Sequence, residues 1–349
     1  MSAALQPRPP TATLLDAALA RASLAHAGGG QAPLRRAGTR ASPLALVQTR
    51  LVLQALGQAA GLAPQQAGLA VPLATSGDAE QRRSLAALGG KGLFAKEIHE
   101  ALLDGRVDFA VHSLKDLETE LPPGLVIAAH LPREDVRDAL VLAPGTPPEE
   151  HARPFPTLPV GARIGTASAR RMAQLRHARP DLRFGLLRGN VQTRLARLAA
   201  GDFGATLLAM AGLNRLALNN LALAGREAVA LAPEAMLPAV GQGIIAVTAR
   251  AGDTATLAAL ARLDDPEARL AATAERALLA ALDGSCRTPI GALARRLPDG
   301  RLCLTGLVAR ADGSFLLRRS LSGAPADAAR LGLTLGELLR ADSPADLFA

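Results

Sequence analysis

The sequence predicts an α/β protein with mostly parallel sheets, organised in three domains. Two observations carry this prediction. From Leu34 onward, short β-type runs alternate with longer segments of helical periodicity, and 349 residues are enough for two or three hydrophobic cores. The predicted domains cover 34–132 with about 239–263, then 133–238, and then 264–349. Residues 1–33 are rich in Ala, Pro and Gly and are expected to form a disordered extension outside the fold.

The first block places polar residues where a strand ends and a helix begins. Residues 39–43, TRASP, predict a strand end followed by a helix with Ser42 as N-cap and proline at its first position. Residues 107–111 alternate like a strand and run into HSLKD, which ends with Lys115 and Asp116. Polar groups just past the carboxyl end of a strand lie where open α/β sheets bind ligands.

The second block, after the proline-rich segment 147–159, contains two segments with the same predicted order of strand, turn and helix start. Residues 164–171 predict a strand, a turn and a helix capped by Ser168, and residues 186–194 repeat this order. Both bring arginines beside free backbone N–H groups at a helix N-terminus, where anions bind well. Arginine is unfavourable beside that positive dipole end, so its repetition indicates a negative ligand. For one segment alone, solvated surface arginines would be the better interpretation. The arginines are Arg170, Arg171, Arg188 and Arg194.

The third block is predicted to present a cysteine in a turn. A helix starting at 264–267 should continue to about Leu282 and lead into DGSCRTPIG, which contains Cys286. Small residues leave this thiol accessible, and the neighbouring arginine favours the thiolate. The alternative is a small buried apolar side chain, which Cys303 in its alternating run fits well.

The rest of the third block predicts a small α/β unit. Residues 302–309 and 315–320 are strand-like and flank an Asp-Gly turn, and a helix should begin at about Pro325. Residues 237–243, LPAVGQG, are expected to connect the second block back into the first.

Composition limits the class of partner. A net charge of +8 indicates an anionic partner, but Trp and Tyr are absent and aromatic residues total 2%, which removes the usual platforms for stacking unpaired bases. The arginines also fall at separate turns and helix starts, a distribution that suits a small, multiply charged acid better than nucleic acid.

The remaining counts indicate a cytoplasmic protein without metal. Two cysteines exclude a disulfide framework, as a reducing cytosol predicts, and six scattered histidines offer no metal-ligand spacing. Charges interrupt every apolar run that could cross a bilayer, and Asp16 and Arg21 argue against a secretory signal.

Several motifs, taken together and in this order, resemble the porphobilinogen deaminase family, also called hydroxymethylbilane synthases. The resemblance runs from about Leu34 to the C-terminus. Its motifs are GTRASPLA at 38–45, GGKGLF at 89–94, AVHSLKD at 110–116, the two arginine segments, PAVGQG at 238–243, and Glu275-Arg276 leading to GSC at 284–286.

The resemblance implies two domains like the lobes of a type II periplasmic binding protein, a cleft between them, and a third small α/β domain that carries the cysteine. It implies a transferase of porphyrin and haem biosynthesis that joins four porphobilinogen units head to tail, releases ammonia, and hydrolyses off a linear tetrapyrrole. The chain would grow on a dipyrromethane cofactor bonded to Cys286. A cytoplasmic monomer without metal, membrane or nucleic-acid partner is expected.

The resemblance also assigns roles to residues. Asp116 matches the catalytic aspartate, which we expect to stabilise the cationic azafulvene and bind pyrrole N–H groups, with proton transfer as a second role. Without the motif, a salt bridge to Lys115 or a turn cap would be the simpler interpretation of Asp116. Residues expected to bind the cofactor, besides Cys286, are Arg40, Ser42, Lys115, Thr166, Ser168, Arg170, Arg171, Arg188, Gly189 and Arg194. Residues expected to contact substrate are Lys91 and Phe94 in a mobile loop, Arg215 and Gln242.

Chemistry supports these roles, because each pyrrole carries an acetate and a propionate. A chain of about six rings presents on the order of a dozen carboxylates, for which bidentate guanidinium groups are apt partners. The sequence departs from the family at Ala87, where relatives often have lysine, and at Ala167, where a serine is more usual. These changes remove one cation near the loop and one hydroxyl donor.

Two other functions remain open from the residues alone. A two-lobed receptor for a small dianion would release its ligand on dialysis and would not need Cys286. A basic nucleic-acid-binding protein would lose binding steeply with salt and is disfavoured by the low aromatic content.

Overall fold

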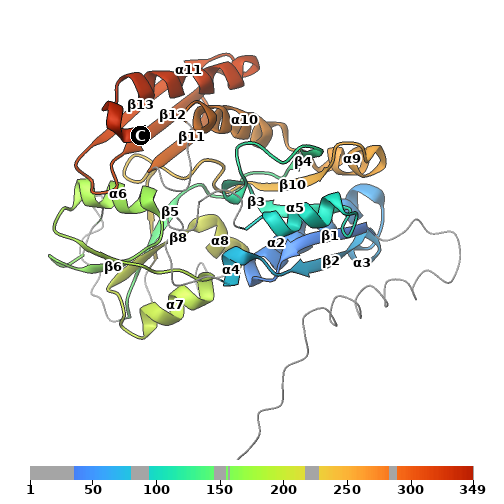
Figure 1. The fold of residues 1–349 in the computed structure, drawn as a ribbon, viewed down its shortest axis with the longest axis horizontal. Helices are drawn as coiled ribbons and strands as arrows, with labels where there is room; N and C mark the ends of the chain where they lie inside the picture. Colours follow the sequence, from blue (N-terminus) through green and yellow to red (C-terminus); the bar gives the residue numbers. More distant parts are fainter. Residues whose placement is uncertain are drawn as a thin grey trace, which may run out of the picture.

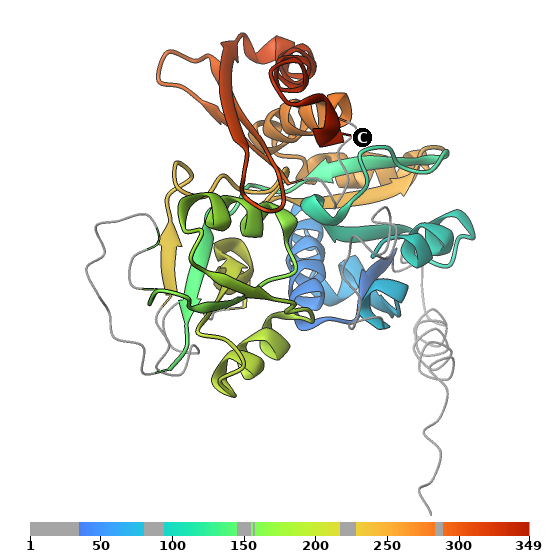
Figure 2. The ribbon, with the colours of Figure 1, turned by 60° about the vertical axis from the view of Figure 1, so that its left-hand side comes forward.

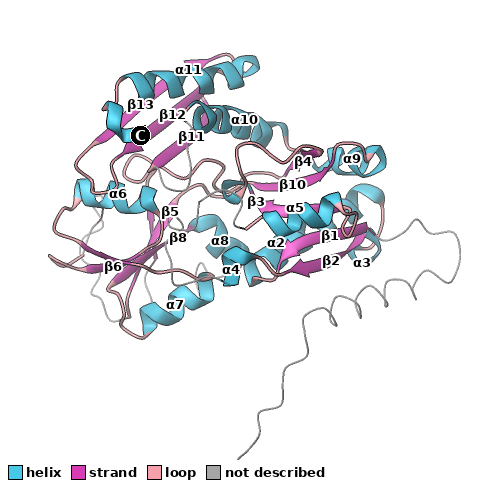
Figure 3. Cartoon of the chain, viewed as in Figure 1, coloured by secondary structure: helices cyan, strands magenta, loops and turns pink. Residues whose placement is uncertain are grey.

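The computed structural model describes residues 35–79, 94–144, 155, 158–216, 228–282 and 289–348. The predicted extension 1–33 lies outside these residues. Helices and strands form three units, each built on its own sheet (Figures 1 and 3). The predicted α/β class is therefore confirmed.

The first lobe is built on a sheet with strand order β2-β1-β3-β10-β4. Strand β1 pairs in parallel with β2 and β3, whereas β10 is antiparallel to β3 and β4. Its strands are β1 (Arg35–Arg40), β2 (Gly68–Leu73), β3 (Phe109–Ser113), β4 (Leu125–His130) and β10 (Ile245–Arg250). Its helices are α2 (Pro43–Ala60), α3 (Pro64–Ala67), α4 (Ser76–Ala79), α5 (Lys96–Leu103) and α9 (Thr254–Leu260), with 3₁₀ turns η2 (Leu114–Asp116) and η3 (Ala261–Leu263).

The second lobe repeats this topology with strand order β7-β6-β8-β5-β9. Strand β6 pairs in parallel with β7 and β8, and β5 is antiparallel to β8 and β9. Its strands are β5 (Asp138–Leu142), β6 (Arg163–Gly165), β7 (Arg183–Gly185), β8 (Ala205–Ala209) and β9 (Ala228–Leu231). Its helices are α6 (Ala169–Ala178), α7 (Val191–Ala199) and α8 (Met210–Arg215).

The chain crosses between the lobes twice, from β4 to β5 and from β9 to β10. Both crossings lie at the carboxyl ends of the parallel strands. The strand that follows each crossing, β5 or β10, therefore starts at that edge of its sheet and runs antiparallel to its neighbours. The expectation of mostly parallel sheets is wrong, because β10 and β5 each run against both of their neighbours and the third sheet is antiparallel throughout. The predicted return connection at 237–243 is confirmed as the second crossing, which leads into β10.

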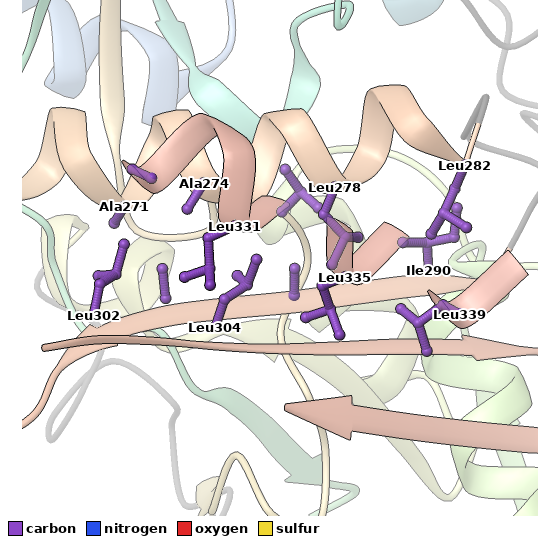
Figure 4. Packing of buried hydrophobic residues seen from close by; sticks show 14 of the residues in the cluster. Ala271, Ala274, Leu278, Leu282, Ile290, Leu302, Leu304, Leu331, Leu335 and Leu339 are labelled. Carbon is purple, nitrogen blue, oxygen red and sulfur yellow. The ribbon is translucent and has the colours of Figure 1, made fainter. Parts of the chain in front are cut away.

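The third unit is an antiparallel sheet of order β11-β12-β13 with helices α10 and α11 packed on one face (Figure 4). Leucines from the helices and from β12 interdigitate between them. Its elements are α10 (Pro266–Ala281), β11 (Ile290–Arg296), β12 (Leu302–Ala309), β13 (Leu316–Gly323), α11 (Ala328–Ala341) and 3₁₀ turns η4 (Pro325–Asp327) and η5 (Ala345–Phe348). Strand β11 was not predicted, because its Gly- and Ala-rich sequence has low β propensity.

Glycine sets the distance between α10 and α11. A Cβ on Gly332 would lie 2.2 Å from the carbonyl oxygen of Ala274 and 2.6 Å from the Cβ of Ala277. We expect Gly332→Ala to lower the free energy of unfolding by about 1–3 kcal/mol, although alanine is intrinsically the better helix former. Urea unfolding would measure this. Gly252→Ala is the control, because a Cβ there meets nothing within 4 Å. Equal stability of the two variants would contradict the packing argument.

Candidate active site

A cavity of about 1080 Å³ lies where the two lobes and the third unit meet. Most of its polar wall comes from turns that follow parallel strands, as the sequence predicted. Eight cationic side chains line it: they are Arg40, Lys115, Arg170, Arg171, Arg188, Arg194, Arg215 and Arg276. Four carboxylates also line it, those of Asp78, Asp116, Glu118 and Glu120. Of the other predicted site residues, Ser42, Phe94, Ser168, Gly189 and Gln242 also line it.

Asp116 ends the 3₁₀ turn that follows β3, and its side chain is 37% exposed. Its only described ion pair is a long one, with Arg40 Nη1 lying 3.9 Å from Oδ2. Arg40 itself pairs with Asp78 of α4, and its guanidinium carbon lies 4.3 Å from the centre of the Phe94 ring. The carboxylate of Asp116 is thus held near a cation and still faces the cavity.

Lys115, beside Asp116, is an ammonium in a poorly solvated position. Its Nζ donates to Gln242 Oε1 at 3.3 Å. Burial lowers its pKa to about 8, with Arg171 and Arg170 acting in the same direction and Asp116 and Asp138 opposing. An anion bound in the cavity would therefore raise this pKa and be bound more tightly by the protonated form.

The lowered pKa gives a stability prediction. Between pH 8 and 10.5 the unfolded chain holds the Lys115 proton more strongly than the folded protein does, so this group makes stability rise with pH in that window. We expect Lys115→Met to reduce the rise in unfolding free energy between pH 7.5 and 9.5, measured by urea unfolding in a Cys286→Ser background without a covalent ligand. The exposed Lys96→Met is the control, and an equal change in both variants would contradict the assignment.

Arg170 and Arg171 share one buried carboxylate. Asp138 Oδ2 lies 2.8 Å from Arg170 Nη2, and Oδ1 accepts hydrogen bonds from Arg171 Nε and Nη2 at 3.2 and 2.7 Å. Burial raises the pKa of Asp138, but the two guanidinium groups outweigh burial and hold it well below its usual range. Since Arg170 also donates to Leu237 O, and Arg171 to Leu207 O, the pair is fixed by the protein and leaves one net positive charge at the cavity wall.

Arg194 differs from this pair because no described carboxylate is paired with it. Its Nε donates to the carbonyl of Gly189 at 2.9 Å, and no carboxylate of the described residues lies within ion-pair distance. Its pKa is lowered to about 10, mainly by burial and in addition by Arg171, Arg188 and Arg40, while Asp116 opposes them. A guanidinium held this way among other cations is a site for a ligand's negative charge.

The helix starts match their predictions. Ser42 Oγ accepts from Ala45 N, and Ser168 Oγ accepts from Arg171 N, each at 3.4 Å. Thr166 lies behind the cavity wall, where it is buried and its hydroxyl accepts from Ser168 N at 3.1 Å. Its predicted contact with a ligand therefore has less geometric support than that of Ser168.

The second crossing connects the lobes at the cavity floor. Gln242 is buried, and its Nε2 donates to Asp138 Oδ1 at 2.9 Å while its Oε1 accepts from Lys115. Arg215 Nη2 donates to Gly243 O at 2.6 Å. Gln242 thus joins the turn that carries Asp116 to the carboxylate that holds the arginine pair.

The third unit contributes to the cavity wall on both sides of the segment 283–288. Cys286 in that segment and Lys91 in the predicted loop lie outside the described residues. Leu279 and Ala280, before the segment, and Ile290, after it, line the cavity. The described residues on either side of the segment that contains Cys286 thus adjoin the arginine-lined space.

Sequence reasoning missed three residues that shape the site. Asp138 stands alone at the start of the apolar strand β5, and an acid in that position is a usable signal. Asp78 carries no such signal, whereas Arg276 belongs to the Glu275-Arg276 motif but was not predicted to line the site. Arg276 Nη2 donates to the carbonyls of Glu118 and Thr119 at 2.7 and 2.6 Å, which ties α10 to the chain just after Asp116.

The fold and the site define a two-lobed α/β protein with a cation-lined cavity that contains the exposed carboxylate of Asp116, with a third unit at the cavity wall. Two family models match the chain: "Porphobilinogen deaminase, dipyromethane cofactor binding domain" over residues 36–258, and "Porphobilinogen deaminase, C-terminal domain" over residues 269–341. The chain belongs to the porphobilinogen deaminase family, which confirms the resemblance found in the sequence.

Curated relatives named porphobilinogen deaminase match nearly their whole length. The protein of Nitrobacter winogradskyi is 47% identical over 297 residues, covering 85% of this chain and 90% of the relative. That of Paracoccus denitrificans is 48% identical over 305 residues, covering 87% of this chain and 93% of the relative. That of Roseiflexus castenholzii is 50% identical over 299 residues, covering 85% of this chain and 92% of the relative.

Likeness to solved structures is weaker. An ancestral arginine-binding protein bound to arginine aligns with a TM-score of 0.37 and 14% identity over 67% of this chain and 92% of that one. Within the described ranges, no helix has the length and apolar character needed to cross a membrane. The same ranges hold no group of three or more His, Cys, Asp or Glu side chains placed to bind a metal ion.

Proposed function

We propose that this protein joins four porphobilinogen units head to tail, releasing one ammonia per unit, on a dipyrromethane bonded to Cys286, and then hydrolyses off hydroxymethylbilane. The observation that carries the proposal is Arg194, a cation without a carboxylate partner among the described residues, in a cavity lined by further cations. The cavity of about 1080 Å³ slightly exceeds the ~300–1,000 Å³ typical of a pocket for one drug-sized ligand, as a multi-ring ligand requires.

The residues fit a dipyrromethane, whose acetates and propionates need several cations at one wall. Arg194, Lys115 and Arg188 would bind its carboxylates, with Ser168 as a hydroxyl donor and the fixed pair Arg170 and Arg171 adding positive charge. When bound, this group supplies the terminal pyrrole to which the first porphobilinogen is joined. Cys286 would hold it through a thioether, and the lining residues on either side of that segment support this anchor point.

Asp116 would act on the incoming porphobilinogen. Its exposed carboxylate can accept the pyrrole N–H and stabilise the cation that forms as ammonia departs. Arg40, whose Nη1 lies 3.9 Å from Asp116, would bind a carboxylate of the cofactor beside Asp116, and Phe94, which lies against Arg40, would contact the substrate. Arg215, Gln242 and the loop residue Lys91 are proposed to complete the substrate contacts.

The same proposal divides the chain into 34–132 with about 239–263, 133–238, and 264–349. It places the protein in the cytoplasm, in keeping with two cysteines in the sequence, and treats it as a monomer without metal, since one chain supplies every residue that the proposal uses.

Incubation of the purified protein with porphobilinogen tests the proposal. We expect one ammonia per porphobilinogen consumed and one tetrapyrrole per four ammonia, measured by enzymatic ammonia assay and mass spectrometry. Recovery of intact porphobilinogen after dialysis, with no ammonia, would instead support the two-lobed receptor.

A further inference from the structure

Helix α6, which carries Arg170 and Arg171, is held by the third unit at its opposite end. Arg176 Nη1 donates to Ala311 O at 3.1 Å, and His177 Nδ1 donates to Gly313 O at 3.0 Å. Both acceptors lie in the turn between β12 and β13, which reaches from the third unit down to α6 (Figure 2). A helix of ten residues spans about 15 Å, so the turn contacts one end of α6 and the cavity lies at the other end.

The turn contacts α6 without space for a side chain. Gly313 has φ +79, and a Cβ there would lie 2.6 Å from Arg176 Cβ and 2.8 Å from both Arg176 C and His177 N. The turn is also closed on itself, since Asp312 Oδ1 accepts from Ser314 N and Oγ at 3.0 and 2.7 Å. A preformed turn therefore lies against helix backbone, which yields less easily than the end of a flexible side chain.

The middle of α6 is fixed to the same neighbours. Ala173 belongs to an apolar cluster with Leu293, Leu307 and Ala309 of the third sheet. Gln174 accepts from Leu237 N at 2.8 Å and donates to Leu237 O at 3.1 Å, which ties the helix to the second crossing. The position of α6 along its axis is thus set by contacts on successive turns.

We propose that the Asp312–Gly313 turn is a positioning element for the cofactor site: by fixing the far end of α6, it holds Arg170 and Arg171 on Asp138 at the cavity wall. The inference rests on the proposed function, in which these arginines contribute to carboxylate binding. It also gives the third unit a role beyond carrying Cys286, because the unit then fixes the helix that presents the two arginines.

A positioning role predicts a loss of function without loss of the fold. Displacing α6 by about 1 Å would move both guanidinium groups relative to Asp138, and misplacements of that size can lower rates on the order of 10²-fold. Ligand capture should be affected first, because these cations bind charge and do not touch the reacting carbon.

Gly313→Val in the full-length protein tests this, with Gly300→Val as the matched control. Gly300 lies in the other turn of the same sheet with φ +83, and a Cβ there meets nothing within 4 Å, so backbone strain is similar and only the contact with α6 differs. We expect the fraction carrying the dipyrromethane adduct, measured by intact mass, to fall at least threefold in Gly313→Val. In the adduct-bearing fraction, the KM for porphobilinogen should rise about tenfold with altered salt dependence. Both variants should remain folded at the assay temperature, with Gly313→Val melting lower than Gly300→Val because its Cβ meets α6.

A parental adduct fraction and KM in Gly313→Val, or equal losses in Gly300→Val, would overturn the inference. If Gly313→Val folds poorly, the double variant Arg176→Met with His177→Leu is measured in its place. It removes both hydrogen bonds between α6 and the turn without adding a clash, and the same loss of adduct and rise in KM are expected. Arg170→Leu separates the two proposals. If Arg170→Leu lowers the adduct fraction and raises the KM while Gly313→Val leaves both unchanged, the positioning role alone is overturned. If Arg170→Leu leaves both unchanged, the carboxylate-binding role on which the positioning role rests is overturned.

Discussion

Asp116→Asn is expected to keep the mass of the dipyrromethane adduct and to lower the rate of ammonia release about 10²–10³-fold. The amide keeps the size of the side chain but loses the negative charge that would stabilise the cation formed as ammonia departs. The exposed position of Asp116 in the cavity means that this change removes no buried hydrogen bond, so the fold should persist. Steady-state ammonia release and intact mass measure the two effects.

Asp104→Asn is the control for this prediction, because Asp104 is exposed at the end of α5 and pairs only with its neighbour Arg106 among the described residues. Near-parental ammonia release by Asp116→Asn would remove Asp116 from the chemical step.

Arg194→Met is expected to lower kcat/KM on the order of 10²-fold, since a charge-assisted contact to a ligand carboxylate would be lost. The same change should raise the melting temperature of protein without a bound anion, measured in a Cys286→Ser background. The pKa of Arg194, lowered to about 10, means that its charge opposes folding at neutral pH, and methionine removes that charge.

Arg197→Met is the matched control, because Arg197 lies on the same helix, is 43% exposed and pairs with Asp202 at 2.8 Å. It should change neither quantity by much. A less stable Arg194→Met protein with unchanged kcat/KM would show Arg194 to be structural and would refute the polyanion site.

Local signals in the sequence were sufficient for the elements that carry the site. Ser42 and Ser168 cap helices at the predicted positions, and Asp265 caps the helix that was predicted to start within 264–267, because a capping side chain needs only its own neighbours along the chain. The turns after β3 and β6 follow from the same kind of local signal, so the sequence alone places their polar residues at one edge of a sheet.

Features that depend on distant parts of the chain were not predictable in this way. The antiparallel course of β5 and β10 follows from the two crossings, which a pattern along one segment does not record. Asp138 and Arg171 come into contact only in the folded chain, where Arg171 donates to the carboxylate. The sequence predicted Arg171 as a cation for a ligand and did not predict this partner. The contact of Gly313 with α6 likewise joins residues more than one hundred positions apart.

Intact mass of the purified protein tests the central claim most directly. The measured mass should exceed the sequence mass by one dipyrromethane, and peptide mapping should locate the excess on Cys286, with Cys303 unmodified. Fully active protein with an unmodified Cys286 would contradict the account.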